Sequence, residues 1–160
     1  MKRKTMVLLM AVLLLCPAAC GREGADALPK GEETEMEKEQ FYITAGETTF
    51  TADFADNSSA EAWKELLEQG DLTIEMQDYG NFEKVGDLET DLPGNDTSIT
   101  TEPGDVILYN GNSITIYYDT NSWSFTRLGK IQNVTGEELL EALGPGRVSV
   151  TFSLSDPQGY

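Results

Sequence analysis

The sequence contains no histidine, only two cysteines and few basic residues. Without histidine the chain lacks the usual general base, the common partner of serine and cysteine nucleophiles, and the commonest zinc ligand. The 28 acidic residues outnumber the 11 basic ones, which gives a formal net charge of −17. Such a chain repels nucleic acid phosphates, so we expect no nucleic acid partner. Cations, cationic peptides and neutral ligands are compatible with its charge.

The N-terminus has the pattern of an export signal. Three basic residues at positions 2–4 precede the apolar run TMVLLMAVLLL and the small-residue segment CPAAC. A permanent transmembrane helix needs about 20 apolar residues, and this run is shorter. The segment Ala18-Ala19-Cys20-Gly21 resembles a bacterial lipobox, although Pro17 stands where leucine is usual. The resemblance implies a lipoprotein signal peptide over residues 1–19 and a lipid on Cys20. An ordinary secretory signal cut near Ala19 is the alternative.

This N-terminus predicts an exported protein that a lipid anchors to the extracytoplasmic face of a cell membrane. Cys16 would leave with the signal peptide, so the folded part contains no cysteine and no internal disulfide. Residues 20–39 contain many charges and few large apolar groups. Such a segment buries too little surface to offset its chain entropy. We therefore expect a flexible acidic tether, followed by one domain over residues 40–160.

The periodicity of the domain predicts an all-β fold with two short helices. Alternation in ETTFTADF and RVSVTFSL is typical of half-buried strands, and Asn110-Gly111-Asn112 predicts a hairpin turn. DNSSAEAWKELLEQG and TGEELLEALG predict the helices, and each ends at glycine. Asn57 or Ser58 can cap the first helix, and Thr135 with Glu138 predicts a capping box at the start of the second. Residues 89–105 are polar and predict a long loop. About eight short strands in one domain favour a closed eight-stranded barrel.

The segments ADNSSAEAWKELL, FEKVGDL, GDVILY and FTRLGKI resemble the bacterial cyclophilin-like domain family. The resemblance covers residues 40–154 and implies a cyclophilin-like β-barrel, whereas it leaves the biochemical role undefined. In cyclophilins the prolyl-isomerase arginine belongs to the third strand, in a Phe-His-Arg pattern that a Gln-Gly-Gly-Asp strand follows. The corresponding stretch, DLTIEMQDYGNFEKVGDL, contains neither pattern. The resemblance therefore implies a domain without isomerase activity.

Arg127 is one candidate for ligand binding, because an arginine can bind a carboxylate or a backbone carbonyl. The alternative is a structural ion pair with an acidic residue such as Asp105 or Glu83. The domain has 21 acidic residues against five basic ones, and this surplus favours the ion pair.

The other candidates surround the central hairpin. Tyr109, Tyr117 and Trp123 could form an aromatic groove for a ligand, or they could fill and cover the barrel. Tyr117 and Tyr118 must face opposite sides of a strand, so at most one lies in the barrel core. Glu83 follows a turn near this groove and could act as an acid or a base.

No second carboxylate is paired with Glu83 by spacing, so we expect Glu83, Lys84 and Asp87 to lie on the solvated surface. The polar loops lack the spacing of a calcium-binding loop. We expect neither a metal nor a cofactor.

Three functions fit these features. The first is a non-enzymatic module that binds a peptide or small-molecule ligand. The second is a peptidyl-prolyl isomerase or folding factor for exported proteins. The third is an enzyme that acts on a small molecule with Arg127 and tyrosines.

Overall fold

The computed structural model describes residues 38–159 and contains nine strands and two helices there. In chain order they are β1 (Gln40–Ala45), β2 (Thr48–Phe54), α1 (Ser58–Glu68), β3 (Leu72–Tyr79), β4 (Glu83–Asp87), β5 (Thr97–Thr100), β6 (Asp105–Tyr109), β7 (Ser113–Tyr117), β8 (Ser122–Ile131), α2 (Gly136–Leu143) and β9 (Arg147–Ser153). The expected signal peptide, Cys20 and the expected tether up to residue 37 lie outside the described residues.

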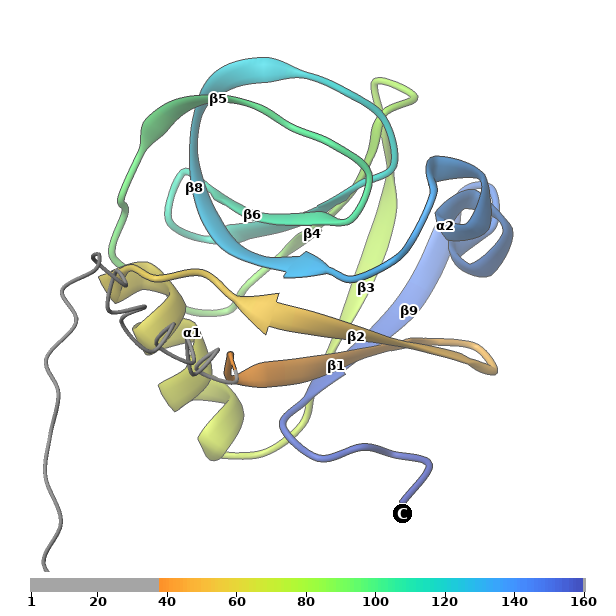
Figure 1. The fold of residues 1–160 in the computed structure, drawn as a ribbon, viewed down its shortest axis with the longest axis horizontal. Helices are drawn as coiled ribbons and strands as arrows, with labels where there is room; N and C mark the ends of the chain where they lie inside the picture. The colour runs from red at the N-terminus through yellow and green to blue at the C-terminus, as the bar shows by residue number, and fades with distance from the viewer. Residues whose placement is uncertain (1–37, 160) are drawn as a thin grey trace, which may run out of the picture. The chain divides into compact units, whose positions relative to one another are not determined.

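Eight antiparallel strands close into a barrel (Figure 1). Neighbouring strands follow the order β2, β1, β9, β3, β4, β7, β6 and β8. The last strand returns to the first, because Ala52 of β2 pairs with Ile131 of β8 and Phe54 pairs with Gly129. Closure leaves these eight strands no free edge. The predicted all-β fold, a closed eight-stranded barrel with two short helices, is confirmed.

The ninth strand, β5, corrects the prediction of one long loop over residues 89–105. Thr97–Thr100 pairs with residues 122–125 at the start of β8. β8 is ten residues long, and β6 pairs only with residues 126–130 of it. The backbone groups in the first half of β8 therefore have β5 as a partner. β5 thereby supports the part of β8 that carries Trp123.

Both helices begin at the predicted capping residues. The Asn57 side chain accepts hydrogen bonds from two backbone N–H groups in the first turn of α1, and Thr135 and Glu138 form the capping box of α2. The two helices lie on opposite sides of the strands in Figure 1, yet Trp63 of α1 and Leu139 of α2 are buried in the same core. Neither helix in the described part of the chain is long and apolar enough to cross a membrane.

Alternation along the strands sorts the buried apolar side chains into two clusters. Ile116 of β7 and Tyr118 belong to the main core, which fills the barrel. Tyr117 lies in a second cluster with Ile107 of β6 and Phe125 of β8, on the outer face. The neighbouring tyrosines therefore face opposite sides, as alternation predicts. Both are nevertheless buried, because the outer face has an apolar cluster of its own.

The turn between β6 and β7 is the hairpin predicted from Asn110-Gly111-Asn112. Asn110 and Gly111 have φ values of 51° and 79°, in the left-handed region that asparagine and glycine adopt most readily. The Asn112 N–H donates to the Tyr109 carbonyl at 3.3 Å. In the resulting register Ile107 pairs with Thr115, so Thr115 and Tyr117 share the outer face with Ile107.

β4 buries two charged residues that were expected in solvent. Glu83 pairs with Tyr117, so its side chain faces the outer side of the barrel. Lys84 pairs with Ile116, so its side chain faces the interior. Glu83 is 7% exposed and Lys84 is fully buried. The prediction of a solvated position is wrong for both residues and correct only for Asp87, which is exposed.

Lys84 is buried among oxygen atoms that satisfy its charge. Its Nζ lies 2.8 Å from Asp78 Oδ1 and donates to the carbonyls of Gly144 and Gly146 at 2.7 and 2.8 Å. Asp78 also accepts hydrogen bonds from the Gly146 N–H and the Tyr118 hydroxyl. This cluster joins β3 and β4 to the loop between α2 and β9.

Candidate functional site

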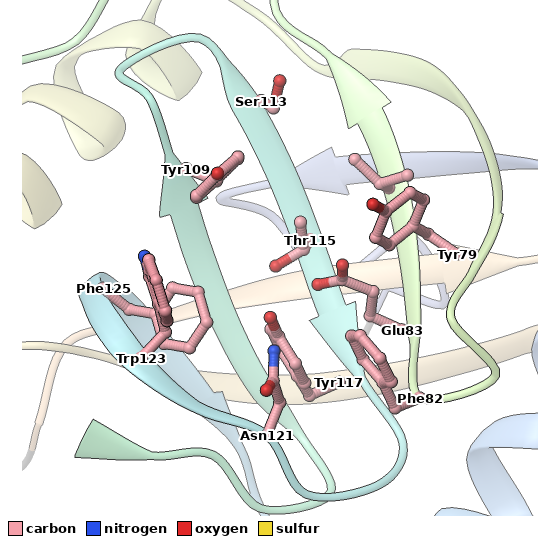
Figure 2. A pocket seen from close by; sticks show the side chains of 11 residues that line it. Tyr79, Phe82, Glu83, Tyr109, Ser113, Thr115, Tyr117, Asn121, Trp123 and Phe125 are labelled. Atoms are coloured by element: carbon pink, nitrogen blue, oxygen red, sulfur yellow. The ribbon is translucent and has the colours of Figure 1, made fainter. Parts of the chain in front are cut away.

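The outer face of the barrel carries a cavity of about 450 Å³ above the second apolar cluster. Figure 2 shows that its walls come from the end of β3, from β4, β6, β7 and β8, and from the turns beside them. The volume lies in the usual range for small-molecule sites. The lining side chains come from positions that face outward or border a turn: Tyr79, Phe82, Glu83, Val85, Tyr109, Ser113, Thr115, Tyr117, Asn121, Trp123 and Phe125.

Five aromatic rings form a continuous wall. Phe82 and Tyr117 stack with their ring centroids 6.0 Å apart and their planes 9° from parallel. Tyr117 contacts Phe125 at 5.7 Å, and Phe125 contacts Tyr109 at 6.4 Å. Tyr79 packs edge-on against Phe82 at 6.3 Å. These rings give the cavity an apolar lining with π-electron faces, which favour apolar groups and cations.

Three aromatic side chains at the cavity remain largely in water. Trp123 is 66% exposed, Tyr79 is 63% exposed and Tyr109 is 42% exposed. Large rings grouped on a surface are typical of places where another molecule binds. These three residues therefore mark the mouth of the cavity.

The inner end of the cavity is polar. Glu83 and Thr115 lie on neighbouring strands and are 7% and 2% exposed. In Figure 2 the Glu83 carboxylate and the hydroxyls of Thr115 and Tyr117 point toward one another. Among the described residues, neither Glu83 Oε2 nor Thr115 Oγ1 has a hydrogen-bond partner of normal geometry. Buried polar atoms are rarely left in this state.

The surroundings shift the pKa values of Glu83 and Tyr117, the two acidic groups at this end. Burial raises the pKa of Glu83, and the nearby hydroxyls of Tyr117 and Thr115 oppose that rise only in part. Burial, with a second contribution from Glu83, raises the pKa of Tyr117 well above its ordinary value. No lysine or arginine is among the lining residues, which all belong to the described part of the chain.

The structure brings four of the five predicted ligand-binding residues to this cavity. Tyr109, Tyr117, Trp123 and Glu83 all line it, although they come from three strands, β6, β7 and β8, and from the start of β4. The aromatic residues therefore both cover the barrel and form a hollow, and the two interpretations of their role are compatible.

Arg127 does not line the cavity. Its Nη2 lies 3.1 Å from Asp105 Oδ2, and Asp105 is buried. Lys130 approaches the other carboxylate oxygen of Asp105 at 3.3 Å. Arg127 borders a separate hollow beside Asn57 and Asp96. The ion pair with Asp105, one of the two partners that the sequence suggested, is present.

Sequence reasoning missed several lining residues. Tyr79 and Phe82 flank the turn Gly80-Asn81, and Thr115 occupies the same outward face as Tyr117. The alternation of β7 could have indicated Thr115, since every second residue of a strand shares one face. Nothing local indicates that β4 pairs with β7, and this pairing places Glu83 beside Tyr117.

The arrangement is suited to recognition. Apolar walls can bind the body of a ligand, and the buried oxygens can accept hydrogen bonds from one polar group. Glu83 is the sole carboxylate that lines the cavity in residues 38–159. No three His, Cys, Asp or Glu side chains in the same residues are grouped so that they could hold a metal ion.

Sequence comparison adds to this description of the fold. The chain matches none of the curated proteins. The sequence profile of the cyclophilin-like family matches residues 43–153, from within β1 to the last residue of β9. The match includes every strand of the closed barrel and both helices, and it covers well over half of the chain. The chain belongs to the cyclophilin-like family.

Proposed function

We propose that this protein is an extracytoplasmic binding module, anchored to a membrane, that holds a peptide or small-molecule ligand without acting as a prolyl isomerase. The observation that carries the proposal is the aromatic cavity on the outer face, which has apolar walls and two buried oxygens that lack a hydrogen-bond partner of normal geometry among residues 38–159. Apolar cavities with a few convergent polar groups are the usual form of ligand sites.

The charges near the cavity support binding rather than isomerisation. In cyclophilins, an arginine of the third strand polarises the amide of the proline bond. β3 of this chain, Leu72–Tyr79, contains no arginine, and no arginine of residues 38–159 lines the cavity. Arg127 is held by Asp105 elsewhere on the barrel. The isomerase alternative would therefore need a different catalytic group.

The anchoring part of the proposal depends on the N-terminal sequence. A basic start, an apolar run and a small-residue segment ending at Cys20 support export and lipidation. Metabolic labelling with an alkyne fatty acid, followed by membrane fractionation, tests this part. We expect label and membrane association for the native chain and the loss of both for Cys20→Ser. A labelled Cys20→Ser chain would contradict lipidation at this residue.

NMR titration of residues 21–160, which contain the whole barrel, tests the binding function. The probes are short peptides and small organic molecules that span cationic, neutral and anionic groups. We expect at least one class to shift the amide signals of Thr115, Tyr117 and Phe125. Trp123→Ala should weaken this binding. If no class shifts these signals, the cavity is not a binding site.

A proline-peptide isomerisation assay on the same protein tests the alternative. We expect no increase over the uncatalysed rate. An increase over that rate would instead favour a peptidyl-prolyl isomerase.

A further inference from the structure

The buried acceptors of the cavity indicate which chemical group a ligand would bring. Glu83 Oε2 and Thr115 Oγ1 lack a hydrogen-bond partner among residues 38–159, although both side chains are more than nine-tenths buried. A carboxylate accepts hydrogen bonds and cannot donate them when ionised. The hydroxyls of Thr115 and Tyr117 lie near Glu83 and only partly offset the effect of its burial. A ligand group with N–H or O–H donors would satisfy both Glu83 Oε2 and Thr115 Oγ1.

The charge around Glu83 favours a cation. No basic side chain lines the cavity in the described part of the chain. Lys84, the next residue along β4, faces the barrel interior and binds Asp78. Burial raises the pKa of Glu83, so an ionised carboxylate is unfavourable there until a positive charge approaches it. The net charge of −17 also attracts cations toward the barrel.

The aromatic wall favours the same kind of group. Phe82 and Tyr117 stack beside the carboxylate, and Phe125 continues the wall. Aromatic rings attract ammonium groups and also contact the carbon chain that carries them. A carboxylate or phosphate on the ligand would instead meet Glu83 with a like charge.

We infer that the cavity binds a protonated amine, whose N–H groups donate to Glu83 Oε2 and Thr115 Oγ1 while its carbon chain lies along the aromatic wall. This inference rests on the proposed binding function and specifies its ligand class. The nitrogen must carry hydrogens, since a quaternary ammonium cannot satisfy the two acceptors. A lysine side chain of a peptide and a free alkylamine present the same chemistry.

The shape of the cavity is compatible with both sources. Its volume is about 450 Å³, and its mouth lies between the exposed rings of Trp123, Tyr79 and Tyr109. A chain that enters past these rings can place its charged end at Glu83 and leave the rest of the molecule outside. A peptide backbone or a longer alkyl chain would then lie against Trp123.

NMR titration of residues 21–160 at pH 7 with matched probes tests the inference. Hexylammonium is compared with 1-hexanol, which lacks the charge, and with hexyltrimethylammonium, which lacks the N–H donors. N-acetyl-lysine-N′-methylamide is compared with the norleucine analogue to test the peptide source. We expect hexylammonium to bind at least about tenfold more tightly than either control, the size typical of a hydrogen-bonded charge.

Two charge-neutralising variants separate a local contact from the general field of an acidic protein. Glu83→Gln removes the proposed acceptor, and Glu75→Gln removes an equal charge from an exposed position on β3 outside the cavity. We expect Glu83→Gln to weaken hexylammonium binding at least about tenfold, whereas Glu75→Gln should leave it within about twofold. A retained two-dimensional amide spectrum shows that each variant is folded.

Each outcome decides between the inference and the function on which it rests. Tight binding of the amine with loss in Glu83→Gln supports both. Equal binding of 1-hexanol and hexylammonium at Tyr117 and Phe125 overturns the amine inference and leaves the binding function standing. Tight binding of hexyltrimethylammonium overturns the role of the N–H donors. If no probe shifts the cavity signals, both proposals fail. The lysine peptide and its norleucine analogue then show whether the amine site also accepts a peptide side chain.

Discussion

Asp78→Asn is the substitution that most sharply tests how β4 is placed in the barrel. Lys84 is fully buried, and Asp78 is its only carboxylate partner among the described residues. The change removes the negative charge and keeps the size of the side chain. It also replaces one acceptor oxygen by an NH₂ group, whereas in the native protein the N–H of Gly146 and the hydroxyl of Tyr118 both donate to Asp78.

The expected loss in the free energy of unfolding depends on how deeply Asp78 and Lys84 are buried. Removing one partner of a buried pair usually costs about 3–5 kcal/mol, because a charge is left without compensation. The Asp78 side chain is 32% exposed, so water can replace part of the stabilisation that its carboxylate provides to the Lys84 ammonium. The carbonyls of Gly144 and Gly146 still accept from the ammonium. We therefore expect the free energy of unfolding to fall by about 2–3 kcal/mol.

Urea unfolding at pH 7 measures this loss, with Asp87→Asn as the matched control. Asp87 also lies on β4 and accepts a hydrogen bond from Ser113, but it is exposed. The control should change the free energy of unfolding by less than about 0.5 kcal/mol. If Asp78→Asn costs no more than this control, Lys84 does not depend on the ion pair, and the inward placement of Lys84 is wrong.

The same pair makes stability depend on pH. The hydrogen bond between Lys84 and Asp78 is the main reason that the pKa of Asp78 is lowered in the folded protein. The stabilisation is therefore present above the ordinary aspartate pKa and is lost as the pH falls through the lowered value. The difference between native protein and Asp78→Asn should shrink over that acidic range. A difference that stays constant as the pH falls would contradict the assignment.

Three further predictions concern the barrel and its cavity. Arg127→Ala should lower the free energy of unfolding by about 1–2 kcal/mol, since among the described residues buried Asp105 then keeps only Lys130 as a cationic partner. The same change should leave hexylammonium binding unchanged. Gly129→Ala should cost about 1–3 kcal/mol in urea unfolding, because a Cβ there would lie 2.6 Å from the Phe41 ring. Glu83→Gln should raise the urea midpoint of unfolding at pH 7, because the raised pKa of Glu83 means that its ionised form destabilises the fold. The difference in midpoint between variant and native protein should disappear toward pH 4, where the carboxyl group is protonated.

Local patterns in the sequence were sufficient for most of the fold. Alternation predicted the strands, Asn57 or Ser58 and Thr135 marked the helix starts, and Asn110-Gly111-Asn112 gave the central turn. These features depend on residues within a few positions of one another. β5 was missed because its four residues are mostly small and polar, and it exists through its pairing with the first half of β8. That pairing joins segments separated by more than 20 residues.

The site was predictable to the extent that it depends on alternation. Tyr109, Tyr117 and Trp123 could be grouped around the hairpin, and the cavity includes all three. The burial of Glu83 could not be predicted, because it follows from the pairing of β4 with β7. Arg127 shares its strand with Phe125, yet Asp105 on the neighbouring β6 binds it away from the cavity. Such choices of partner are set by tertiary packing.

The pKa of Glu83, followed by ¹³C NMR of its side-chain carboxyl with and without hexylammonium, tests the central claim most directly. The other titratable group facing Glu83 from β7 is Tyr117, whose raised pKa keeps it neutral across the range in which a carboxyl titrates. We predict a pKa above the ordinary glutamate value in the free protein and a lower one when hexylammonium is bound, because a bound cation favours the ionised carboxylate. A pKa that does not change on saturation with hexylammonium would contradict the account.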